Sequence, residues 1–157
     1  MDELPPTLYE WAGGGAALER LTVVFYEKVL ADPLLFPVFQ HMPADHPKHV
    51  AAFIGEVLGG PVTYSTERGG HPAMVSRHLG RALNEEKRLR WMSLLLQSAD
   101  EVGLPDDPEF RSAFVAYIEW GSRLAVINSQ PGAECPEPDA PMPKWGWGVV
   151  GGPYKKE

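Results

Sequence analysis

Residues 53–78, FIGEVLGGPVTYSTERGGHPAMVSRH, contain two glycine pairs and two histidines. An apolar helical run ends at the first glycine pair, and residues 61–70 are predicted to form a loop that ends in the second. Long connections inside compact helical domains are often functional. In the short apolar segment that follows, His78 stands directly after Arg77, where a simple core would have leucine. The meaning of this histidine therefore depends on what the rest of the chain places near it.

Four longer segments have apolar residues at helical spacing and are bounded by capping residues or by glycine and proline. They predict helices over 16–31, 45–58, 84–102 and 107–128. Shorter helical turns are expected after Thr7, ending at the glycines 13–15, and around Pro37. The expected N-terminal caps are Thr7, Asp45, Asn84 and Asp107. The expected inward face of the third helix comprises Leu89, Met92, Leu95, Leu96 and Ala99. Because no segment alternates with period two, the predicted fold class is all-α.

With 157 residues, the chain is predicted to form one compact domain, large enough to bury a flat ligand. The helical part is expected to span residues 1–130. Residues 131–157 are rich in proline and glycine and are predicted to form a non-helical tail. The aromatic residues Trp145, Trp147 and Tyr154 indicate that the end of this tail docks on another surface.

The composition disfavours several classes of partner. The formal net charge is −7 at pH 7 and the basic residues are scattered, so no nucleic-acid partner is expected. No run approaches the ~18 apolar residues of a membrane span, and the start MDELPPTLYEW is unlike a secretory signal. We therefore expect a cytoplasmic protein. Cys135 is the only cysteine, which leaves no disulfide framework and no thiolate metal cluster.

The catalytic motifs GxSxG, GxxxxGKS/T, HExxH and CxxC are absent from the sequence. A structural zinc site would lack cysteine or clustered carboxylate partners. A single histidine can instead be the one protein ligand of a metal whose other ligands come from a cofactor. Haem is the obvious example, because the porphyrin supplies four nitrogens and the protein one axial imidazole. From the residue alone, a histidine satisfied within the core is the alternative.

Four segments, in order, resemble the group II truncated haemoglobins, the short two-over-two globins. They are LTVVFYEKVLADPLLFPVF (21–39), FIGEVLGGPVTYSTERGGHPAMVSRH (53–78), RLRWMSLLLQSADEVGLPDDPEF (88–110) and AYIEWGSRLAVINS (116–129). The resemblance runs from about Leu8 to Ser129. It rests on the ordered combination of the Phe25-Tyr26 pair, Phe39, the Gly59-Gly60 stop, the Arg77-His78 pair and Trp91.

This resemblance implies a truncated globin fold, a two-over-two helical sandwich around one non-covalent haem b. His78 matches the proximal iron ligand, whose second ring nitrogen needs an acceptor to fix the tautomer. Arg77 matches a residue that meets a haem propionate, with an ordinary solvated arginine as the alternative. Tyr64 and His71 are further candidates for the same rim. The apolar and aromatic walls are expected from Phe39, Phe53, Ile54, Met74 and Leu96.

The resemblance also implies a set of polar residues around the bound gas. Tyr26 and Trp91 match the distal pair, whose phenol O–H and indole N–H would donate to a ligand and take part in any catalysis. Two large core aromatics are the alternative reading of this pair. His46 and Val50 fall near two distal positions on the next helix. If His46 faces the iron, it adds a third donor or a second axial ligand; if it points outward, it is a surface histidine.

Three uses are consistent with such a pocket. The first is tight binding of dioxygen and other diatomic ligands such as NO and CO. The second is redox chemistry, in which nitric oxide is oxidised or peroxide is activated and an external reductase supplies electrons. The third is ligand sensing. The chain could be a monomer or a homodimer. The alternative from another class is a haem-free helical interaction module that docks through its aromatic tail, KWGWGVVGGPY.

Overall fold

The computed structural model describes residues 4–137 and 140–148. Within these residues the secondary structure is helical and includes no strand, so the predicted all-α class is confirmed. The helices are α1 (Leu8–Ala12), α2 (Gly14–Ala31), α3 (Phe36–Phe39), α4 (His46–Val57), α5 (Thr63–Arg68), α6 (Gly70–Ser76), α7 (Glu85–Glu101) and α8 (Pro108–Asn128). In the described part of the chain, no helix is both long and apolar enough to cross a membrane.

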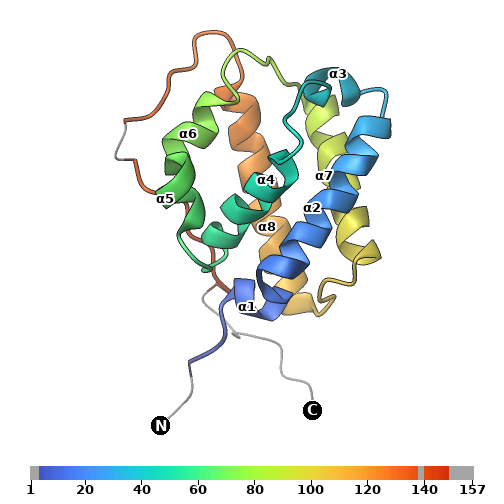
Figure 1. The fold of residues 1–157 in the computed structure, drawn as a ribbon, viewed down its shortest axis with the longest axis vertical. Coiled ribbons are helices and arrows are strands. Elements are labelled where there is room, and N and C mark those ends of the chain that lie inside the picture. Colours follow the sequence, from blue (N-terminus) through green and yellow to red (C-terminus); the bar gives the residue numbers. More distant parts are fainter. Residues whose placement is uncertain (1–3, 138–139, 149–157) are drawn as a thin grey trace.

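Four long helices form the body of the molecule. Helix α2 packs against α4 and α7, and α7 packs against α8, while α5 and α6 extend from the end of α4 (Figure 1). The core is filled by apolar side chains that these helices turn inward. Leu18, Leu21, Phe25, Phe110 and Phe114 are among its fully buried members. Their helical spacing in the sequence explains why the faces of α2 and α8 meet in one core.

Three of the predicted caps are confirmed. Thr7 and Glu10 form a reciprocal capping box at α1. Asn84 Oδ1 accepts a hydrogen bond from the Lys87 amide, and Asp107 Oδ2 accepts one from the Phe110 amide, both at 2.9 Å. These bonds satisfy amide groups that a helix leaves without partners at its start. Asp45 precedes α4 but makes no capping bond, because its carboxylate binds the His49 ring instead.

The loop predicted over residues 61–70 is wrong, since α5 lies within it. This helix has only six residues and carries no apolar stripe in the sequence, so periodicity does not reveal it. Two tertiary contacts stabilise it. The Tyr64 side chain is fully buried, and the carboxylate of buried Glu56 accepts a 2.8 Å hydrogen bond from the Ser65 amide. Gly69, with φ of 89°, then ends α5 in the left-handed conformation that favours glycine.

The predicted inward face of α7 is also partly wrong. Leu89 is 53% exposed, whereas Arg88 beside it is buried. The Arg88 guanidinium forms ion pairs with Glu85 and with Glu119 of α8. A buried charge is tolerated only when it is paired, and these partners let Arg88 take a buried position on the face that also contains Leu95 and Ala99.

Described residues of the tail pack back onto the helices. The Trp145 amide donates to the Val57 carbonyl oxygen at 2.9 Å, and Trp147 Nε1 donates to the Pro6 carbonyl oxygen at 2.7 Å. The Trp147 ring also packs against Trp11, with ring centroids 5.7 Å apart. Tyr154, which was expected to take part, lies outside the described residues. The division at residue 130 stays a prediction.

We predict that Trp147→Ala lowers the free energy of unfolding by about 1–3 kcal/mol, because it removes aromatic packing and one hydrogen bond. Urea denaturation of the purified protein measures this change. Lys144→Ala is the matched control, since Lys144 is an exposed residue of the same segment. Equal midpoints for the two variants would show that the tail contributes no stability through Trp147.

Candidate functional site

One cavity of about 560 Å³ contains the residues that the sequence analysis singled out. It is bounded by side chains from α2 through α8 and from the connections between them. Twelve of the thirteen predicted residues line it: Tyr26, Phe39, His46, Val50, Phe53, Ile54, Tyr64, His71, Met74, Arg77, His78 and Trp91. Residues distant in the sequence thus meet around one space, whose size is typical of cofactor sites. Leu96, expected in the same wall, packs against the core and is not part of the lining.

His78 lies just after α6 and has a fixed orientation. Its Nδ1 donates a hydrogen bond to the Met74 carbonyl oxygen, at 2.9 Å, one helical turn earlier. This bond assigns the proton to Nδ1 and leaves Nε2 with a free lone pair. Burial lowers the pKa of the His78 ring, and the positive charges of Arg81 and Arg77 act in the same direction. A neutral imidazole with one free nitrogen is the form that binds metals.

Four side chains, which we call the distal cluster, line the cavity from α2, α3, α4 and α7: Tyr26, Phe39, His46 and Trp91. His46 Nε2 lies 3.1 Å from the Tyr26 hydroxyl, so this histidine faces the cavity and not the outside. The Tyr26 ring packs edge to face on Phe39, with ring centroids 5.7 Å apart. Phe25 packs on Trp91 in the same way, at 5.4 Å. These contacts fix the rings that carry the polar groups.

The distal cluster is uncharged at neutral pH. Burial, reinforced by the positive charges of Arg77 and Arg81, lowers the pKa of His46 to about 4. Burial raises the pKa of the Tyr26 phenol. A neutral imidazole and a neutral phenol can share one hydrogen bond in two ways. If His46 Nε2 carries the proton and donates, the Tyr26 hydrogen is free to point at a ligand. If Tyr26 donates, its oxygen presents only lone pairs to the cavity.

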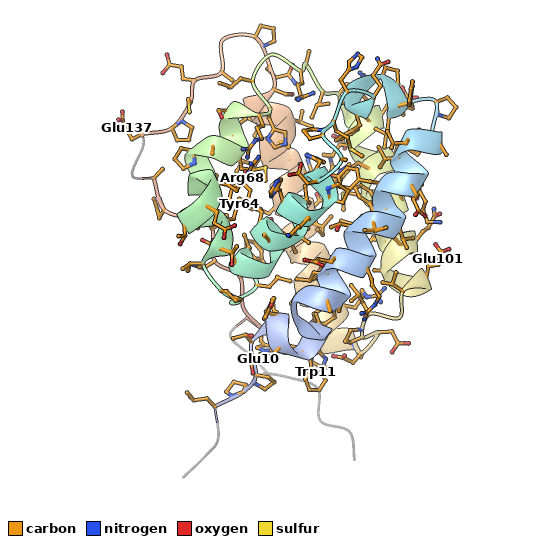
Figure 2. All side chains as sticks on the ribbon, viewed as in Figure 1. Glu10, Trp11, Tyr64, Arg68, Glu101 and Glu137 are labelled. Atoms are coloured by element: carbon orange, nitrogen blue, oxygen red, sulfur yellow. The ribbon has the colours of Figure 1, made fainter. Side chains whose placement is uncertain are left out.

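Basic side chains line part of the same cavity. Arg77 donates to the Tyr64 hydroxyl and lies over its ring at 5.6 Å, while Tyr64 is held edge to face on Phe53. Figure 2 shows Tyr64 and Arg68 on α5, on the side toward the centre of the molecule. In the described part of the chain, Arg68 Nε and His71 Nδ1 are buried without a hydrogen-bond partner. Buried polar atoms without partners are rare, and here they indicate a polar ligand.

Sequence reasoning missed most of the contribution of α8. Residues of this helix that line the cavity include Tyr117, Ile118, Trp120, Gly121, Ser122 and Leu124. Arg68 of α5 and Arg81 after His78 also belong to the lining. The apolar period of α8 predicts a buried face, but it does not distinguish residues that contact the core from residues that face a cavity. Arg68 lies in residues 61–70, which are predicted to form a loop, so the sequence assigns it to no helical face.

The residues present fit a haem. Apolar and aromatic walls suit the porphyrin, the free Nε2 of His78 suits the iron, and the unpartnered atoms of Arg68 and His71 suit carboxylates. No single member of this set is specific. Together, an all-helical sandwich and a cavity with one fixed neutral histidine define a globin.

Comparison with known proteins agrees with this class. The sequence model of the bacterial-like globins matches residues 7–119. The chain is 34% identical over 117 residues to Group 2 truncated hemoglobin YjbI of Bacillus subtilis (strain 168), an alignment that covers 74% of this chain and 86% of that protein.

Solved structures are similar over most of their length. The group II truncated haemoglobin from Bacillus anthracis superimposes with a TM-score of 0.72 and 27% identity, covering 79% of this chain and 93% of that one. A truncated oxygen-avid haemoglobin from Bacillus subtilis gives 0.68 and 31%, covering 77% and 99%. The chain therefore belongs to the bacterial-like globin family, among the truncated haemoglobins of group II. Haem binding and oxygen binding follow from this membership.

We predict that His46 makes the protein less stable in acid. The unfolded chain protonates this ring near its ordinary pKa of 6.5, but the folded chain does so only near 4. Between these values the unfolded state binds more protons, so the free energy of unfolding falls as the pH falls through this window. Urea titrations from pH 7 to pH 4 should show a shallower fall for His46→Gln than for the unchanged protein. Lys48→Gln, at an exposed site on α4, is the control; an unchanged slope in His46→Gln would contradict the prediction.

Proposed function

We propose that this chain holds haem b without a covalent bond and binds dioxygen tightly, using donors from the distal cluster. The observation that carries the proposal is the common cavity: His78, with its free Nε2, and the Tyr26–His46 pair line the same space. A fixed imidazole for the iron and hydrogen-bond donors for a gas are the two requirements of such a site.

The residues that would hold the haem have separate tasks. His78 Nε2 is the proposed iron ligand, and Met74 holds the ring through its carbonyl oxygen. Arg77, placed by Tyr64, and the unpartnered Arg68 and His71 are the proposed partners of the haem carboxylates. Phe39, Phe53, Val50 and Met74 supply apolar wall. When bound, haem would supply an iron that can bind a small gas molecule.

The distal cluster would slow the escape of dioxygen. Tyr26 and Trp91 present O–H and N–H groups, and His46 can orient Tyr26 by donating to its oxygen. In a buried, weakly screened space, hydrogen bonds from these groups to a ligand that carries negative charge would be charge-assisted. The neutral state of His46 avoids the cost of a buried charge beside the gas.

The same donors support redox chemistry. A donor aimed at an O–O bond stabilises charge that develops there, which is what oxidation of nitric oxide by dioxygen or activation of peroxide requires. Repeated turnover would need electrons from a reductase. The haem-free interaction module is less well supported, because Trp145 and Trp147 pack on helices of their own chain.

Dioxygen release from the reduced, haem-loaded protein tests the proposal. Tyr26→Phe and Trp91→Phe should each accelerate release about 10- to 100-fold, since a hydrogen bond to a charged group contributes about 1.5–3 kcal/mol. Stopped-flow absorption measures the rates. Trp11→Phe is the matched control, because its indole lies outside the cavity lining. Rates that stay unchanged in both distal variants would contradict the assigned role of the distal cluster.

A further inference from the structure

Three aromatic residues at α8 connect the cavity with the surface. We call Tyr117, Trp120 and Trp145 the α8 aromatic cluster. Tyr117 and Trp120 both line the cavity. Tyr117 is 6% exposed, whereas Trp120 is 40% exposed, so one tryptophan has a face on the cavity and a face in solvent. The Trp120 indole can therefore contact both a group in the cavity and a molecule in solvent.

The tail completes the cluster. The Trp145 ring lies against Tyr117 and Trp120, with ring centroids 5.8 and 5.6 Å apart. Trp145 is held there by the hydrogen bond from its amide to the Val57 carbonyl oxygen, and Pro143 touches the cavity two residues earlier. The family match ends at residue 119, before both tryptophans. Tyr117 lies inside the matched range, and the two tryptophans lie beyond it.

Indole and phenol rings are among the side chains that lose a single electron most easily. An oxidised ring can also take an electron from another ring in contact with it. We propose that Trp120, supported by Tyr117 and Trp145, is a surface oxidation site for bulky phenolic one-electron donors. Such donors are too large to share the cavity with haem. They would return an electron to the oxidised indole of Trp120 from the solvent side while peroxide is reduced inside the cavity. This inference rests on the proposed haem site.

The reaction balances with named reactants. Hydrogen peroxide takes up two electrons and two protons in the cavity and leaves as two water molecules. Each of two phenol molecules gives one electron and one proton at the surface and leaves as a phenoxyl radical. Trp120 loses one electron toward the cavity and regains one from the phenol in each half of the cycle. The indole is therefore unchanged overall.

Other tryptophans in the chain provide an internal comparison. Trp11 and Trp147 form a pair with each other, and Trp147 also contacts Phe110. Neither tryptophan of this pair lines the cavity. Both are half-buried, as Trp145 is, but they have no face on the cavity. Oxidation that depends on the cavity should therefore spare them.

Peptide mass spectrometry tests the inference in the haem-loaded full chain treated with hydrogen peroxide and no donor. We expect oxygen to be added at Trp120 or Trp145, and little at Trp11 and Trp147. A bulky phenol added beforehand should protect the cluster. Equal oxidation of all four tryptophans would overturn the proposal, because it would indicate attack by peroxide from solvent.

Turnover provides a second measurement. Trp120→Phe should lose most of the oxidation of a bulky phenol, and Trp147→Phe should keep it. Unchanged phenol oxidation in Trp120→Phe would overturn the inference. A loaded protein that leaves peroxide unreduced would overturn it too, while leaving dioxygen binding intact. A chain that takes up no haem would overturn both this inference and the proposed function.

Discussion

The hydrogen bond from His78 Nδ1 to the Met74 carbonyl oxygen is the constraint on which the site depends. It fixes the ring plane, the tautomer and the direction of the free nitrogen at once. The bond exists because α6 is short and ends just before His78, which leaves a carbonyl oxygen of its last turns within reach of the ring. Burial then keeps the ring neutral. Without this bond, neither the tautomer nor the direction of the His78 ring would be fixed.

The distal side depends on a second pair of neutral groups. His46 and Tyr26 come from different helices, α4 and α2, and the packing of those helices places them within hydrogen-bond distance. Burial suppresses charge on both. The outcome is a polar but uncharged wall, which can stabilise charge on a small ligand without introducing a charge of its own. Basic residues at another part of the cavity would balance haem carboxylates. The charged side chains therefore lie apart from the uncharged distal cluster.

Much of the fold could be predicted from the sequence because helical periodicity and capping are local signals. The spans of α2, α4, α7 and α8 follow from them to within two residues at each end. Helix α5 could not be predicted, since its stability comes from buried Tyr64 and from Glu56, which lies outside it. The apolar pattern predicts that Leu89 points inward, because it cannot anticipate that a paired arginine takes the buried position.

The candidate site was less predictable than the fold from local sequence patterns. A single histidine has no partners in the sequence, so only the ordered resemblance brought His78, Tyr26 and Trp91 together, and their roles stay predictions. The side of α8 that faces the cavity depends on how that helix is rotated, which is a tertiary property.

An absorption spectrum of the haem-reconstituted protein tests the central claim most directly, measured in the reduced state with carbon monoxide. The account predicts a Soret band that shifts with carbon monoxide. It also predicts that the band is lost or strongly altered in His78→Gly and regained when imidazole is added. A His78→Gly spectrum identical to that of the unchanged protein would show that the iron has another ligand, and the assignment of His78 would be wrong.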